Sequence, residues 1–108
     1  MEKWCTESVE NLFRAILTLK NEEECRCFFE DVCTVKEMQE IAQRLSVADM
    51  LSKKMVYNEI ARETGASTAT ISRVNRCLSY GSGGYEMVLN RLAQSKKSGE
   101  SSDESSDE

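Results

Sequence analysis

Apolar residues recur along the chain at the three- and four-residue spacing of amphipathic α-helices. In residues 6–20, for example, this spacing is shown, with charged residues in between, by Val9, Leu12, Phe13, Ile16 and Leu17. No segment has the two-residue alternation of a strand, so the pattern predicts an all-α chain of six helices. The expected helices cover residues 6–20, 22–32, 34–54, 56–64, 67–81 and 85–94.

Polar residues at the expected helix starts support these boundaries. Asn21 precedes three consecutive glutamates, and this order suits both the capping of a helix and its dipole. Thr34 and Glu37 have the spacing of a capping box. Ser67 or Thr68 can cap the fifth helix. The start of each of these helices is therefore predicted from local chemistry as well as from periodicity.

Composition agrees with one helical domain. The chain has 108 residues, of which 40% are hydrophobic, and it contains no Pro to break a helix. It has no apolar run of about 18 residues and begins with charged residues, so we expect a cytoplasmic protein without a membrane span or export signal. Residues 1–94 are expected to form the domain. Residues 95–108 offer no apolar side chain to a core and are expected to be a disordered acidic tail.

The net charge of −5 is unevenly distributed along the chain. Residues 1–52 carry six basic and eleven acidic side chains, and residues 95–108 carry two basic and five acidic ones. Residues 53–78 are the exception, with five basic side chains against two acidic ones. A local basic segment matters more for phosphate binding than the total charge does. The acidic chain can therefore still bind nucleic acid through this segment.

Residues 57–78 combine two short helices with a tight turn. Ala61, Gly65 and Ile71 lie at the spacing of a helix-turn-helix, which is expected to occupy about residues 56–80. Ala61 is small and lets the two helices cross closely. Gly65 can adopt the positive φ that reverses the chain. The apolar contacts that hold the crossing are expected from Ile60, Ala66, Ile71 and Val74.

The outward face of the second of these helices indicates DNA binding. Thr68, Ser72, Arg73 and Arg76 are expected to be exposed, with Thr70 and Asn75 beside them, and no acidic residue occurs between residues 64 and 85. Hydroxyl groups can bind phosphate oxygens or base edges. An arginine can hold guanine O6 and N7 through two hydrogen bonds. We therefore predict a regulator that reads double-stranded DNA in the major groove.

With these residues the chain resembles the Trp repressor superfamily, and more narrowly the Trp-repressor-related bacterial proteins of the YerC/YecD type. The resemblance covers residues 6–94, and it is carried most specifically by Thr34, Arg44, Gly65-Ala66 and the segment 69–73. It implies an all-α, intertwined homodimer with a six-helix Trp-repressor-like fold. The fourth and fifth helices would read DNA, and the other helices would build the dimer core.

The resemblance also implies site residues. The family's DNA-contacting positions correspond to Tyr57, Asn58, Thr68, Ala69, Thr70, Ser72 and Arg73, and Arg76 is added here from its expected exposure. The positions that surround the amino acid in Trp repressor correspond to Thr34, Arg44, Arg73, Val74 and Cys77. Trp repressor has Gly where this chain has Val74, and Ser where it has Cys77. Because a branched side chain overpacks a site that Gly leaves open, we predict that L-tryptophan is not the effector, and the effector is left unassigned.

The sequence leaves a protein-interaction module open as an alternative function and argues against an enzyme. A helical dimerisation or protein-interaction module would use the apolar stripe from Met38 to Leu51 as its working surface. An enzyme is not expected, because the chain has no His and therefore no base of the usual kind to activate a Cys nucleophile. No cofactor is expected either.

The cysteines do not indicate a metal site. They number five, and the chain has no export signal, so reduced thiols are expected in place of disulfides, some of them in the core. Cys25 and Cys27 are closer together than the usual zinc-ligand pair, and no matching pair follows.

Overall fold

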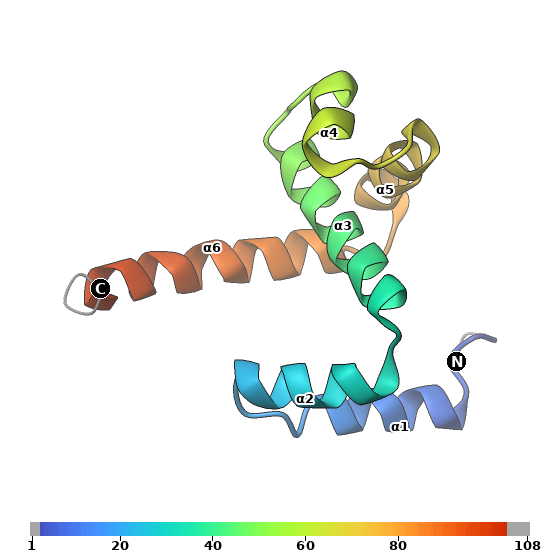
Figure 1. Ribbon diagram of the computed structural model, residues 1–108, viewed down its shortest axis with the longest axis vertical. Helices are drawn as coiled ribbons and strands as arrows, with labels where there is room; N and C mark the ends of the chain where they lie inside the picture. The colour runs from blue at the N-terminus through green and yellow to red at the C-terminus, as the bar shows by residue number, and fades with distance from the viewer. Residues whose placement is uncertain (1–2, 104–108) are drawn as a thin grey trace. The chain divides into compact units, whose positions relative to one another are not determined.

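A computed structural model of the protein describes residues 3–103, and the side chains of residues 3–96. These residues form six α-helices and no strand, which confirms the predicted fold class (Figure 1). The helices are α1 (Glu7–Ile16), α2 (Glu22–Val32), α3 (Val35–Ser52), α4 (Tyr57–Thr64), α5 (Thr68–Tyr80) and α6 (Gly84–Asp103). The chain divides into two compact units, one ending at Gln39 and one beginning at Glu40.

The predicted caps are present at the helix starts. The Asn21 side chain accepts a hydrogen bond from the Glu24 N–H at 2.9 Å, at the start of α2. At the start of α3, the Thr34 hydroxyl accepts from the Glu37 N–H at 3.0 Å, and the Glu37 carboxylate accepts from the Thr34 N–H at 2.9 Å. The capping box is thus confirmed in both of its bonds.

α1 is shorter than its apolar pattern predicts, since it ends at Ile16 and not near residue 20. The Thr18 hydroxyl donates to the Ala15 carbonyl at 2.7 Å. A hydroxyl that bonds nearby backbone groups competes with the helical ladder, and this favours a turn. Leu17 consequently lies in the turn after α1, with 82% of its surface exposed.

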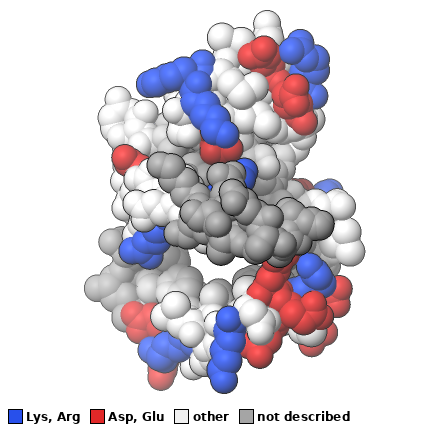
Figure 2. Space-filling view, turned by 90° about the vertical axis from the view of Figure 1, so that its left-hand side faces the viewer, with Lys and Arg blue, Asp and Glu red and all other residues white. Residues whose placement is uncertain are grey.

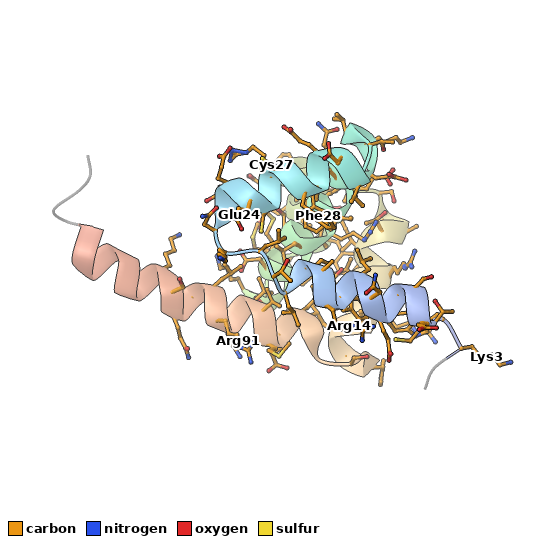
Figure 3. All side chains as sticks on the ribbon, turned by 90° about the horizontal axis from the view of Figure 1, so that it is seen from below. Lys3, Arg14, Glu24, Cys27, Phe28 and Arg91 are labelled. Atoms are coloured by element: carbon orange, nitrogen blue, oxygen red, sulfur yellow. The ribbon has the colours of Figure 1, made fainter. Side chains whose placement is uncertain are left out.

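The first unit consists of α1, α2 and the start of α3. Figures 1 and 3 show α1 and α2 side by side, running in opposite directions. Aromatic residues pair within this unit: Trp4 lies edge-on to Phe13 with ring centroids 6.3 Å apart, and Phe28 lies edge-on to Phe29 at 5.2 Å. None of the side chains described in this unit is buried.

The second unit contains a core that α3, α4 and α5 share. The buried residues are Val47, Ala48, Ile60, Ala66, Ile71 and Val74. The last four confirm the predicted helix-turn-helix core. Val47 and Ala48 come from the C-terminal half of the α3 stripe, where Met50 and Leu51 also pack against this core. The apolar stripe from Met38 to Leu51 is the surface that an interaction module would use. Its C-terminal half is therefore already covered by residues of the same chain.

α6 continues beyond the predicted domain boundary at residue 94 and reaches Asp103. This corrects the expectation of a disordered tail for residues 95–103, while residues 104–108 lie outside the described part of the chain. No Pro interrupts this segment, and an existing helix gains one hydrogen bond for each residue it adds. Within the described residues, no helix combines the length and apolar character that a membrane span requires.

Candidate DNA-binding interface

Hydrogen bonds hold the turn between α4 and α5 in place. Gly65 ends α4 at φ +75°, the left-handed conformation predicted for it, and its N–H donates to the Ala61 carbonyl at 2.8 Å. The Thr64 hydroxyl accepts from the Ala66 N–H at 3.1 Å. The side-chain amide of Gln43, on α3, donates to the Thr64 carbonyl at 3.0 Å. Gln43 carried no sequence signal, because its partner lies 21 residues away along the chain.

The start of α5 is capped by Ser67, one of the two predicted candidates. Its hydroxyl oxygen accepts from the Thr70 N–H at 3.1 Å and lies 3.1 Å from the Thr70 hydroxyl oxygen, to which it donates. Thr68 is exposed and is left available to a ligand. Thr70 is half-buried, and its hydroxyl is already engaged as an acceptor. Thr68 is therefore better placed than Thr70 to bind DNA.

The predicted DNA-contacting residues lie on the surface of the helix-turn-helix. Seven of them are exposed, and only Thr70 is half-buried. The exposed ones on α5 occupy positions 68, 69, 72, 73 and 76, which share one face of a helix. The opposite face carries the buried Ile71 and Val74. α5 is thus anchored on one side and exposes hydroxyl and guanidinium groups on the other.

A shallow cleft of about 680 Å³ lies between the start of α4 and one side of α5, and each residue that lines it has a polar group in its side chain. Tyr57, at the start of α4, lines it together with Ser72 and Arg76 of α5, so the structure brings these predicted residues together. Ser79 and Tyr80 also line the cleft and were missed in the sequence. Their positions, four residues after Asn75 and Arg76, are the signal that could have identified them, because helical residues at this spacing are neighbours.

Among the side chains that the structure describes, the two α5 arginines have no acidic partner. Arg73 and Arg76 form no ion pair with any described residue, whereas Arg62 on α4 lies 3.9 Å from the Glu59 carboxylate. Figure 2 shows basic side chains, in blue, and acidic side chains, in red, at the top of the view. An unpaired, exposed guanidinium can bind a phosphate or a base edge without first breaking a bond within the protein.

The residues expected around an effector are divided between the two units of the chain. Arg44 and Cys77 line one cavity of about 590 Å³, whose wall continues into the glycine-rich loop 81–84 and Tyr85. Thr34 belongs to the first unit and lines a separate cavity, where it closes the capping box. Arg73 lines neither of these cavities. Val74 is only 1% exposed, and its side chain packs into the helix-turn-helix core.

All five cysteines are unpaired. Cys25, Cys27 and Cys77 are exposed and Cys5 and Cys33 are half-buried, so the prediction that some thiols lie in the core of the chain is wrong. Four of the five cysteines belong to the first unit. No described side chain of that unit is buried, so these four thiols have no core in which to lie.

The comparisons with known proteins agree with this geometry. The family model described as "Trp repressor protein" matches residues 7–93. The chain belongs to the Trp repressor family. It is 51% identical to the uncharacterized protein YerC of Bacillus subtilis over 96 residues, which cover 89% of this chain and 92% of that protein. This identity supports membership of the YerC-type, Trp-repressor-related branch.

Two solved structures of the Trp repressor family share the fold. A TrpR-like protein from Eubacterium eligens is 56% identical, with a TM-score of 0.79 over 82% of this chain and 91% of that one. A candidate Trp repressor from Staphylococcus aureus is 51% identical, with a TM-score of 0.78 over 82% and 88% of the two chains. The Trp repressor family is one of transcription regulators, not of enzymes.

Proposed function

We propose that the protein is a sequence-specific DNA-binding regulator that inserts α5 into the major groove of double-stranded DNA. The observation that carries this proposal is the two-sided character of α5, which buries Ile71 and Val74 and exposes Arg73 and Arg76. Arginines in this position can read guanine, and neighbouring hydroxyls can bind base edges or phosphates. We propose further that it acts in the cytoplasm as a repressor.

The second part of the proposal is a homodimer. The first unit buries none of its described side chains, and Trp4, Leu17 and Val35 are 64%, 82% and 74% exposed. Such small units need a further surface to cover their apolar side chains. A second copy offers a matching apolar surface, because a twofold interface uses the same residues on both sides. It would also place two α5 helices about 34 Å apart, one turn of DNA.

The third part is that L-tryptophan is not the effector. Arg44 and Cys77 line a cavity that Arg73 does not line, and a Val side chain stands where Trp repressor has Gly. Titration calorimetry of the protein with L-tryptophan, with and without bound DNA, tests this. We expect no heat of binding in either titration. Saturable binding at micromolar concentration would show that the amino acid is the effector.

The main experiment is selection of bound duplexes from random genomic fragments. We expect enrichment of one pseudo-palindromic motif, with half-sites one helical turn apart. The variant with Arg73→Ala and Arg76→Ala should lose about 1–3 kcal/mol of binding free energy for each base contact removed. Its oligomeric state and helical content should be unchanged. Selection that enriches no motif would contradict the proposed function.

A helical interaction module is the second candidate, and the exposed apolar side chains of the first unit favour it. In that case the arginine double variant would bind a protein partner as tightly as the unaltered chain does. Neither the variant nor the unaltered chain would select a DNA motif. The same selection experiment therefore separates the two functions.

A further inference from the structure

Lys54, in the turn between α3 and α4, has an unusual backbone conformation. Its φ is +67°, and it is the one non-glycine residue with positive φ among residues 3–103. Its N–H donates to the Leu51 carbonyl at 2.9 Å, and the Met55 N–H donates to the Met50 carbonyl at 3.1 Å. These two bonds form a Schellman motif, whose left-handed position usually holds Gly. Lys54 thus places a long cationic side chain at a position where the left-handed backbone favours Gly, which has no side chain.

The ammonium group of Lys54 is available to a ligand. Neighbouring Lys53 is engaged, because its Nζ lies 3.1 Å from the Asp49 carboxylate. Lys54 is exposed and forms no ion pair with any residue whose side chain is described. Glu86 lines the same groove as Lys54 without pairing with it. The two adjacent lysines therefore differ in what they can bind.

The surface around Lys54 continues into the proposed DNA-binding face. Lys54 lines a groove of about 490 Å³ together with Asn75 and Ser79 of α5. The same Asn75 and Ser79 line the shallow cleft between α4 and α5, which Tyr57 and Arg76 also line. One side of α5 thus links the turn before α4 to the residues that face DNA.

We propose that Lys54, with the side chains of Asn75 and Ser79, binds one phosphate of the DNA backbone beside the half-site that α5 reads. This proposal rests on the proposed function and adds a contact to it. One cation and two neutral donors suit a phosphate oxygen. The turn before α4 thereby fixes the position of α5 on the duplex. Contacts of this kind position a protein on DNA and carry no base sequence information.

The test is Lys54→Gly in the full chain, with the duplex that the unaltered protein selects as the probe. Gly removes the cation and suits the left-handed backbone, so the thermal midpoint should not fall. The slope of log affinity against log salt should become shallower by about 0.9 for each phosphate that the variant no longer neutralises, and affinity at 0.1 M salt should fall roughly tenfold for each such phosphate. The decrease should be equal for the selected duplex and for duplexes with altered half-sites.

Two further variants make the result specific. Lys53→Ala removes the paired neighbour and should bind DNA with unchanged affinity and salt slope. Glu86→Gln, added to Lys54→Gly, tests whether Lys54 only neutralises that carboxylate, and the double variant should bind DNA as weakly as Lys54→Gly does. The proposal is overturned if Lys54→Gly keeps the full affinity and salt slope, if Lys53→Ala reproduces its weaker binding, or if the added Glu86→Gln restores the affinity. If the unaltered protein selects no duplex, it is the proposed function that fails.

Discussion

The helix-turn-helix and the N-terminal hairpin of α1 and α2 have equally clear amphipathic patterns but different surroundings. Around α4 and α5, the chain covers its own apolar residues, and Ile60 and Ile71 are completely buried. Around α1 and α2, the chain covers none of them completely, and Phe13 and Leu17 remain 43% and 82% exposed. An amphipathic pattern thus identifies a helix and its apolar face, but it does not say which surface covers that face.

The comparison assigns different tasks to the two regions. The helix-turn-helix is held by its own core and by the bond from Gln43 to the turn, so contacts within the chain position its reading face. In our proposal, the hairpin depends on a surface outside its own chain, that of a second copy. Changes in the hairpin should therefore affect assembly, and changes in the helix-turn-helix should affect local stability or DNA binding.

The largest effect is expected from Leu17→Asp. If a second copy covers this side chain, the variant buries an uncompensated carboxylate, which costs about 3–5 kcal/mol at each occurrence. The dimer should dissociate, and sedimentation analysis should show the mass fall to that of one chain. Asn11→Asp adds the same charge at an exposed polar position of α1 and should leave the dimer intact. A monomeric unaltered protein would remove the contrast between the two regions.

A smaller but still large effect is expected from Ile71→Ala. This side chain is completely buried, and truncation in such a site typically lowers the free energy of unfolding by about 2–5 kcal/mol. Thermal denaturation should show a lower midpoint, with the same decrease at every protein concentration. If the decrease vanished at high concentration, the core around α5 would depend on assembly as the hairpin does.

The smallest effect is expected from Ser67→Ala, which removes the cap of α5. Loss of such a cap typically costs about 1 kcal/mol, and the thermal midpoint should fall by a few degrees. Thr68→Ala is the matched variant, because Thr68 is exposed and makes no cap bond. It should keep the midpoint and weaken DNA binding. Equal midpoints for the two variants would show that the cap bond contributes nothing to stability.

The sequence alone determined the order of the helices, several of their ends and the core of the helix-turn-helix. Asn21, the Thr34–Glu37 pair and Gly65 all act where they were predicted to act. Such features depend on bonds between residues two to five positions apart, so a short stretch of sequence contains all the atoms involved. The predicted exposed face of α5 follows from the same logic, because helical spacing sets which residues lie opposite the buried ones.

Only the tertiary structure decided how distant segments meet. The bond between Gln43 and Thr64, the cleft that joins Tyr57 to Tyr80, and the groove from Lys54 to Ser79 each involve segments more than 20 residues apart in the sequence. It also decided that Lys54, and not Lys53, takes the left-handed position after α3. These outcomes depend on which helix faces pack together, and that choice is made by the whole core and not by any one segment.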